Sequence, residues 1–365
     1  MFPTLATASM VPLYYLLLSR KCDENAMLLY KDTDAVSYEQ MRRVKRSFAY
    51  RIAEKIALGD GLKERWSYSA QKLAVWLENN DQSKARKPPA QYYKKFVIEE
   101  ITVNQFPCYF MSPPPLRYDT APRNTGSVIL YFHGGGFIYE MHQMHWVFAQ
   151  RILDAARVPV CIPMYPIFPR IDPEETVQFM LACYKELLAR YPAADIIALG
   201  DSAGSDLNLS FWHYIYLNKI DVPFPEKIIL ISPAMVAGND DSVIGKMKEI
   251  ERYDVMLSTD MLATLHELFQ FPAGELNYWT APLYGDFCAF PPMYVFSGTY
   301  DIFYPQVQPF VDRVRSQGKQ IEFWTGYKMM HDWPVVPAVG ECEAAFAKVM
   351  EIIDGRIIDL YNPPR

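Results

Sequence analysis

The sequence predicts an α/β protein with a mostly parallel central sheet that is covered by helices on both faces. From residue 127 onward, short apolar runs alternate with helical segments, as in repeated β-α-β units. Around residues 200–204, an apolar run leads through a glycine-flanked turn directly into a helical pattern. The chain has 365 residues, half of them apolar, so it can bury a large core.

The first 90 residues are expected to form a separate helical region. Apolar residues recur three or four positions apart on one face of an expected helix over 41–56, and basic residues cover its other faces. This pattern favours a helix with a solvated charged side over a helix that lies on an anionic membrane. A second helix is expected over 70–80, and residues 83–89 are typical of a linker.

The rest of the chain is expected to supply the sheet and its covering helices. The predicted strands cover residues 96–103, 106–111, 128–132, 158–164, 196–199, 228–231, 293–296 and 321–325. The predicted helices cover residues 145–156, 173–191, 203–217, 307–316 and 339–353. Between 233 and 291 the alternation stops, and only residues 260–269 have helical spacing, so this insertion is expected to be a lid or cap.

Composition and charge limit the classes of partner. The net charge of −6 gives no electrostatic reason to expect a nucleic-acid partner. The six cysteines are scattered without a C-x-x-C pair, so we expect reduced thiols, a cytoplasmic location, and neither a zinc site nor a dithiol redox site. Residues 5–18 are apolar but short for a membrane span, and they lack a preceding basic segment. A helix packed on the body is favoured over a membrane anchor.

Residues 200–204 read G-D-S-A-G between a predicted strand and a predicted helix, which is the context of a nucleophile elbow. Bulk at Gly200, Ala203 or Gly204 would clash, because the chain on either side of the turn packs closely. The helix N-terminus beneath the turn offers free N–H groups and a positive dipole to a developing oxyanion. Ser202 is therefore the candidate nucleophile.

A second glycine-rich motif, H-G-G-G at residues 133–136, follows the predicted strand over 128–132. Such a loop could cradle a phosphate, but the dinucleotide pattern G-x-G-x-x-G and the P-loop pattern are both absent. With a nucleophile elbow in the same sheet, an oxyanion hole is the better interpretation. Its expected donors are the N–H groups of Gly135, Gly136 and Ala203.

A serine nucleophile needs a base, and the chain holds six histidines. Only His331 lies in a loop between the last predicted strand and the final helix, where the carboxyl edge of the sheet would place it over Ser202. Asp301 follows the strand over 293–296 and can hold the imidazole and stabilise its charged form. The order serine, aspartate, histidine is the one this architecture uses.

Other polar residues are weaker candidates. Asp286 and Asp332 could replace Asp301, although residues adjacent in sequence, such as Asp332 and His331, rarely face each other. His142 and His145 have the helical spacing of two metal ligands, but no third ligand and no H-E-x-x-H motif accompany them. We expect these two histidines at a helix N-terminus on the rim of the site, and no metal.

Together these motifs resemble the hormone-sensitive-lipase-like branch of the α/β-hydrolase fold. The match rests on residues 133–136 and 200–204 and covers roughly residues 94–355, including Asp301 and His331. It implies an α/β-hydrolase fold and a serine carboxylesterase or lipase that needs no metal or organic cofactor. It further implies two regions, a helical cap over 1–90 and a catalytic domain over 91–365, with a cap insertion at about 234–290. Ser205 and Asp206 stand where the family usually has Gly and Asn.

The expected reaction is two-step acyl transfer from a small-molecule ester, through an acyl-enzyme on Ser202. Aromatic residues that flank the motifs either form a tight pocket for short or medium acyl chains or pack the core, and these two interpretations carry equal weight: Phe137, Tyr139, Tyr165, Phe168, Tyr304 and Trp333. The expected substrate contacts are those of Phe137, Tyr139, Tyr165 and Trp333. The alternatives are an amidase or peptidase with the same triad and a non-catalytic ligand-binding protein on a hydrolase scaffold. The sequence predicts no particular oligomeric state.

Overall fold

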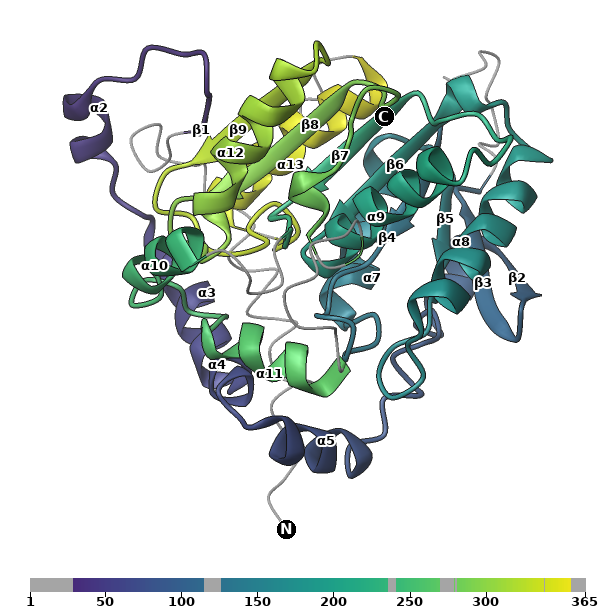
Figure 1. The fold of residues 1–365 in the computed structure, drawn as a ribbon, viewed down its shortest axis with the longest axis horizontal. Helices are drawn as coiled ribbons and strands as arrows, with labels where there is room; N and C mark the ends of the chain where they lie inside the picture. Colours follow the sequence, from purple (N-terminus) through teal and green to yellow (C-terminus); the bar gives the residue numbers. More distant parts are fainter. Residues whose placement is uncertain are drawn as a thin grey trace.

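The computed structural model describes residues 29–114, 126–235, 241–269, 279, 281–337 and 339–355. These residues form an α/β fold around a single sheet, which confirms the predicted fold class (Figure 1). The strands are β1 (Leu29–Lys31), β2 (Val97–Val103), β3 (Phe106–Ser112), β4 (Val128–Phe132), β5 (Val160–Pro163), β6 (Ile196–Asp201), β7 (Lys227–Ile231), β8 (Met293–Gly298) and β9 (Ile321–Gly326).

The order of the strands in the sheet is β1-β9-β8-β7-β6-β4-β5-β3-β2. The six strands from β9 to β5 in this order are parallel, whereas β1, β3 and β2 each run antiparallel to their neighbour. All five residues of β4 and all six of β6 are buried. Strands that are buried on both faces need apolar residues at consecutive positions, which explains the continuous apolar runs.

Helices cover both faces of this sheet. One face packs against α8 (Pro173–Leu188), α9 (Ala203–Leu217) and α12 (Tyr304–Ser316), whose buried side chains share a core with those of alternate strand positions. The other face packs against α7 (Gln143–Ala155) and α13 (Gly340–Asp354), and it forms a second core. The predicted helices of this region are therefore present, with bounds that differ by a few residues.

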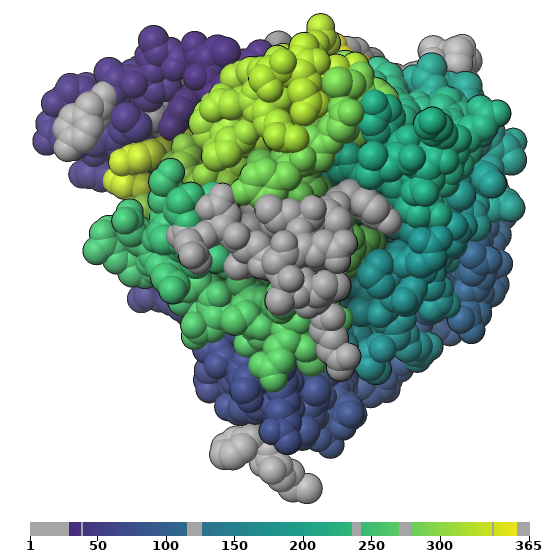
Figure 2. All heavy atoms as spheres, viewed as in Figure 1, coloured from purple at the N-terminus to yellow at the C-terminus, as the bar shows by residue number. Residues whose placement is uncertain are grey.

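A third group of helices lies beyond one end of the strands, at the bottom of Figure 1. The members are α3 (Phe48–Gly59), α4 (Leu62–Trp66), α5 (Ala70–Glu78), α10 (Asp241–Ile250) and α11 (Asp260–Phe269). α11 contacts both α4 and α5, and the buried side chains of α4, α5, α10 and α11 form a separate core that includes Trp66, Leu73 and Met261. Figure 2 shows the green atoms of the 241–269 segment directly beside the blue atoms of α4 and α5.

The predicted helix over 41–56 is wrong in its continuity and its buried face. α2 (Tyr38–Arg43) ends before Val44, and Ser47 caps a new helix, α3, by accepting a hydrogen bond from the Tyr50 N–H. Phe48 and Ile56 are 67% and 45% exposed, whereas Tyr50 is fully buried. The backbone is extended at Val44, with φ −62° and ψ 118°, and the N-cap at Ser47 then begins a new helix, a break that the apolar spacing alone did not reveal.

Four elements were not predicted, namely β1, α4, α6 (Tyr92–Lys95) and α10. β1 pairs with β9 although it precedes the helical segment, so the first 90 residues are not wholly helical. α4 and α6 are too short for a periodic pattern, whereas α10 buries Val243 and Met247 one helical turn apart. Within the described residues, no helix combines the length and the apolar character that a membrane crossing requires. The apolar stretch over 5–18 lies outside the described residues.

Tyr50 ties the amino-terminal helices to the loop that follows β9. Its hydroxyl accepts a hydrogen bond of 2.7 Å from the buried Met330 N–H. The ring packs among Met329, Trp333 and Cys342. Burial raises the pKa of Tyr50 well above its usual value, so the side chain stays neutral at physiological pH.

We expect Tyr50→Phe to lower the free energy of unfolding by about 1–3 kcal/mol, because the buried Met330 N–H loses its acceptor. Chemical denaturation of the purified variant measures this change. Tyr93→Phe is the matched control, since Tyr93 is 49% exposed and its loss of a hydroxyl should cost little. Equal stabilities of the two variants would contradict the anchoring role of Tyr50.

Candidate active site

Ser202 occupies the turn between β6 and α9, with φ +50° and ψ −122°. This is a sparsely populated backbone region that costs about 1–3 kcal/mol and persists only where the surroundings enforce it. The surroundings are backbone atoms: a Cβ on Gly204 would lie 2.1 Å from the Phe132 carbonyl oxygen, and one on Gly200 would lie 2.5 Å from the Gly204 carbonyl oxygen. Glycine at these two positions is therefore a steric requirement of the turn.

The structure brings together the three side chains that the sequence singled out. His331 Nε2 lies 2.9 Å from Ser202 Oγ, and His331 Nδ1 lies 3.0 Å from Asp301 Oδ2. The other carboxylate oxygen of Asp301 accepts a hydrogen bond of 2.9 Å from the Phe303 N–H. Asp301 is fully buried and His331 is 2% exposed. The imidazole therefore bridges a hydroxyl and a fixed carboxylate away from bulk water.

Asp254, from the inserted segment, supports the loop that carries Asp301. One of its carboxylate oxygens accepts a hydrogen bond of 2.9 Å from the Ile302 N–H, and the other accepts from the N–H groups of Met256 and Leu257. Burial, with Asp301 nearby, raises the pKa of Asp254 to about 6. Sequence reasoning missed Asp254, because it belongs to no motif and its partners are backbone groups.

Asp332 contradicts the expectation that it would not face His331. Its Oδ2 lies 3.3 Å from His331 Nε2, on the same nitrogen that faces Ser202. A φ of +53° at Asp332 folds the side chain back, and the Asp332 N–H is held by Ser232 Oγ at 2.9 Å. Adjacent side chains usually point in different directions, but the left-handed backbone at Asp332 turns its side chain toward His331. The expectation that these two neighbours would not face each other was therefore wrong.

Two carboxylates thus act on one imidazole. Burial alone would lower the pKa of His331, but Asp332 and Asp301 outweigh it and hold that pKa well above its ordinary value of 6.5. Burial also raises the pKa of Asp332 to about 6, against the opposing effect of His331. Both carboxylates therefore stabilise the charged form of the imidazole.

The glycine loop after β4 adopts conformations that favour glycine, with φ +121° at Gly135 and +60° at Gly136. A Cβ on Gly135 would lie 2.6 Å from the Tyr139 carbonyl oxygen, and one on Gly136 would lie 2.5 Å from the Trp66 ring. The backbone hydrogen bonds of the described residues leave the N–H groups of Gly135, Gly136 and Ala203 unused. These are the three groups expected to serve as oxyanion donors.

A buried polar network holds this loop from below. Asp201 Oδ2 accepts hydrogen bonds from the Gly134 N–H at 3.0 Å and from His145 Nε2 at 3.1 Å, and its Oδ1 accepts from the Tyr131 hydroxyl at 2.5 Å. Burial raises the pKa of Asp201, but His145 and Tyr131 outweigh it, so the net shift is downward. His145 is thus buried rather than on the rim, whereas His142 caps the N-terminus of α7 as predicted.

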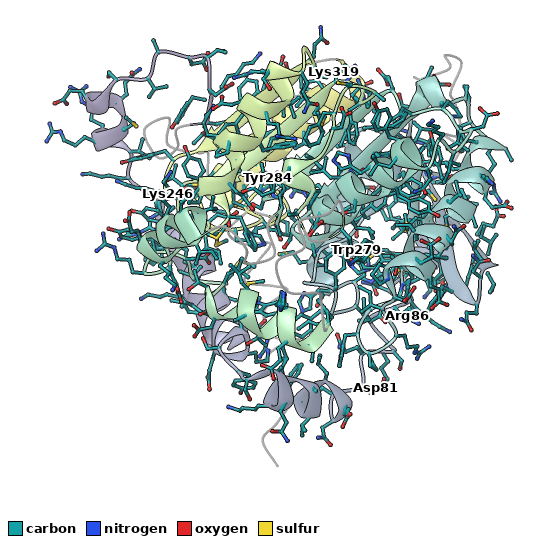
Figure 3. The ribbon with its side chains drawn as sticks, in the orientation of Figure 1. Asp81, Arg86, Lys246, Trp279, Tyr284 and Lys319 are labelled. Carbon is teal, nitrogen blue, oxygen red and sulfur yellow. The ribbon has the colours of Figure 1, made fainter. Side chains whose placement is uncertain are left out.

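A narrow apolar cleft opens onto Ser202, with a volume of about 60 Å³. Phe137 stacks on Trp279, with 6.0 Å between ring centroids, and Figure 3 labels Trp279 between α11 and the sheet. The cap helix α11 supplies much of the wall. The lining residues are Gly136, Phe137, Ser202, Ala203, Asp206, Ala234, Met261, Leu262, Leu265, His266, Phe269, Trp279 and Phe303.

Of the four expected substrate contacts, only Phe137 lines the cleft. Tyr139 packs edge-on against Trp66 and Trp76. Tyr165 is fully buried, because it stacks on His133 and donates a hydrogen bond of 2.5 Å to the His133 carbonyl. Trp333 is also fully buried, against Gly326. These three aromatics are core residues, as the alternative interpretation allowed.

Two polar residues of the cleft were not predicted as site residues. His266 lies on α11, where nothing in the sequence related it to Ser202. Asp206 lies one helical turn after the elbow, and it accepts a hydrogen bond of 3.1 Å from Ser210 Oγ. Burial raises the pKa of Asp206 well above its usual range. The only advance signal was that an aspartate stands where the resembling family usually has asparagine.

Comparisons with known proteins agree with this arrangement. The model of the alpha/beta hydrolase fold family matches residues 129–335, which is more than half of the chain. The chain is 25% identical over 245 residues to a triacylglycerol lipase of Mycobacterium tuberculosis, covering 61% of the chain and 50% of the lipase. It is 24% identical over 222 residues to an acetyl-hydrolase of Streptomyces hygroscopicus, covering 59% of the chain and 72% of the acetyl-hydrolase. The chain thus spans about half the length of the lipase.

Solved structures show the same fold. An esterase from the bacterial hormone-sensitive lipase family superposes with a TM-score of 0.65 at 21% identity, and the superposition covers 83% of this chain and 98% of the esterase. The predicted family resemblance is therefore confirmed, by the family model in sequence and by this superposition in fold.

The contact between Asp332 and His331 leads to a prediction that does not depend on activity. Asp332→Asn removes one of the two negative charges that stabilise the imidazolium, so the pKa of His331 should fall from its raised value. The pH dependence of the His331 ring resonances in an NMR titration measures this pKa. Asp312→Asn, on the exposed side of α12, makes the same change in net charge far from the site. A His331 pKa that shifts equally in both variants would contradict the local effect.

Proposed function

The chain belongs to the alpha/beta hydrolase fold family, and on that basis we propose that it is a carboxylic-ester hydrolase with Ser202, His331 and Asp301 as its catalytic triad. The observation that carries this proposal is the pair of contacts of His331, at 2.9 Å to Ser202 Oγ and 3.0 Å to Asp301 Oδ2. A nucleophile within hydrogen-bond reach of its base, with the base held by an acid, is what acyl transfer requires. The names of the relatives, a lipase, an acetyl-hydrolase and an esterase, support an ester substrate.

The proposed reaction has two steps. His331 takes the proton of Ser202 while Oγ attacks the ester carbonyl, and the N–H groups of Gly135, Gly136 and Ala203 hold the resulting oxyanion. His331 then gives its proton to the leaving alcohol, and an acyl-enzyme remains on Ser202. A water molecule, deprotonated by His331, attacks the acyl-enzyme, and His331 returns that proton to Ser202 Oγ as the Oγ–acyl bond breaks and the acid leaves. One ester and one water thus yield one alcohol and one acid.

We further propose that the acyl chain is short to medium in length. The cleft of about 60 Å³ has room for only a few non-hydrogen atoms beside Ser202. Its wall is mainly apolar, so it can desolvate an alkyl chain and offers little to a charged one. In this proposal the amino-terminal region over 1–90 and the insertion at about 234–290 act as a cap on the catalytic domain over 91–365.

A cytoplasmic location is part of the same proposal. The five cysteines among the described residues are free thiols, and Cys108, Cys161, Cys183 and Cys342 are buried. Thiols without disulfide partners are typical of a reducing compartment.

Ser202→Ala should lower kcat/KM for p-nitrophenyl butyrate by at least ~10⁴-fold, because the acyl-enzyme can no longer form. Release of p-nitrophenolate by the purified protein measures the rate. Ser316→Ala, at an exposed position in the last turn of α12, is the control and should keep full activity. Equal rates for the wild type and Ser202→Ala would overturn the assignment, and faster cleavage of the matching anilide than of the ester would favour an amidase.

Phe269→Ala should extend activity to longer acyl chains, because it removes a ring from the cleft wall. Phe269 packs edge-on against Phe137, with 6.4 Å between the ring centroids. A series of p-nitrophenyl esters from acetate to laurate should peak at a short chain in the wild type and at a longer chain in the variant. Phe48→Ala, which removes a ring that is 67% exposed, should leave the profile unchanged. A wild-type optimum at laurate would contradict the proposed chain length.

A further inference from the structure

A second pocket, distinct from the cleft at Ser202, lies between the amino-terminal helices and the loops that follow β8 and β9. It is lined by Val44, Lys45, Arg46, Arg51, Tyr300 and Lys328, and its volume is about 300 Å³. It shares no lining residue with the cleft at Ser202. Its volume is at the lower end of the range for sites that bind small molecules. The segment between α2 and α3, at the left of Figure 1, supplies Val44, Lys45 and Arg46 to this lining.

Four of the six lining side chains are cations, and two of them are already oriented by protein groups. Lys328 Nζ donates a hydrogen bond of 3.2 Å to the Val44 carbonyl, which holds the ammonium at the pocket wall. Arg46 pairs with Glu54, and its guanidinium lies 5.1 Å from the centroid of the Tyr300 ring. Tyr300 is itself fixed, because the Tyr253 ring stacks on it, with 4.6 Å between the ring centroids and 12° between the ring planes. The pocket thus has a rigid side.

The other two cations, Lys45 and Arg51, are exposed, and they form no ion pair with any of the described residues. Glu54 pairs with Arg46 and also interacts electrostatically with Arg51, so one carboxylate faces these two cations. Glu341 is a second carboxylate nearby, and it accepts hydrogen bonds of 2.6 and 2.9 Å from the N–H and the hydroxyl of Ser47. The four cations of the pocket are thus accompanied by two carboxylates, Glu54 and Glu341. An excess of positive charge therefore remains at one concave site, where an anion would relieve the repulsion.

We propose that this pocket binds the phosphate group of a small anionic ligand. A phosphate carries up to two negative charges and three terminal oxygens, so it can accept hydrogen bonds from the planar forks of Arg46 and Arg51 and from the ammonium groups of Lys45 and Lys328 together. A single carboxylate would leave most of these donors unused. The group could belong to a free phosphorylated molecule or to a lipid headgroup, because both present the same chemistry.

The position of the pocket gives it contact with both loops of the proposed triad. Tyr300 directly precedes Asp301, and Lys328 lies three positions before His331. The Lys328 N–H also donates a hydrogen bond of 2.7 Å to Thr299 Oγ1, so the two loops are joined beside the pocket. A bound phosphate would bridge these loops to the segment between α2 and α3.

Isothermal titration calorimetry at low ionic strength tests the proposal with inorganic phosphate as the probe. A co-sedimentation assay with phosphatidylcholine vesicles, with and without phosphatidic acid, tests the lipid source. The variant is Lys45→Ala/Arg51→Ala, and the matched control is Arg42→Ala/Arg43→Ala, which removes the same charge from exposed residues of α2 outside the pocket. If the double variant does not fold, Arg51→Ala against Arg43→Ala makes the same comparison.

We expect the pocket variant to bind either inorganic phosphate or phosphatidic acid vesicles at least about tenfold more weakly than the control variant does, since it loses two of the four cationic partners. Selective loss in the phosphate arm identifies a free ligand, and selective loss in the vesicle arm alone identifies a headgroup. Equal weakening in both variants, or no binding by the wild type in either arm, would overturn the proposal. Hydrolysis of p-nitrophenyl butyrate should be unchanged in the pocket variant, and the binding result stands whatever that assay shows.

Discussion

The position of one imidazole, that of His331, governs how this molecule can act. Its two nitrogens contact Ser202 at 2.9 Å and Asp301 at 3.0 Å, and the three residues come from three separate strand ends of one sheet. Because the ring is buried, a displacement of about an ångström would leave a polar nitrogen without a partner and separate the proposed base from the proposed nucleophile. The rest of the structure can be understood as the means of holding that ring in place.

The support comes largely from segments outside the sheet. Tyr50 of α3 binds the backbone directly before His331, and Asp254 of the insertion binds the backbone directly after Asp301. Trp66 of α4 packs against Gly136 in the glycine loop. These segments therefore do more than form the cleft wall, since α3, α4 and the inserted segment each contact one of the loops from which the site is built. Two of these contacts, those of Tyr50 and Asp254, are buried hydrogen bonds, whereas a simple lid would need only apolar contacts.

The elements that could be predicted are those whose cause is local in the sequence. The elbow at Ser202 and the glycine loop at Gly135 need small residues at fixed spacing, and the buried strands need continuous apolar runs. All of these features can therefore be recognised from the sequence pattern alone. What could not be predicted depends on contacts between distant segments. The buried face of α3 is set by the bond from Tyr50 to Met330, and the approach of Asp332 to His331 is set by a left-handed backbone. The aromatic residues Tyr165 and Trp333 flank the motifs, yet packing against His133 and Gly326 removes them from the cleft.

The central claim, that Ser202 is a nucleophile activated by His331, is tested most directly by covalent labelling. Diethyl p-nitrophenyl phosphate should react with Ser202 Oγ, which forms a bond to phosphorus as p-nitrophenolate leaves, and peptide mass spectrometry locates the adduct. The account predicts a diethyl phosphoryl group on Ser202 alone, and little labelling in His331→Ala. An adduct on another residue, or labelling of Ser202 at the same rate without the imidazole, would contradict it.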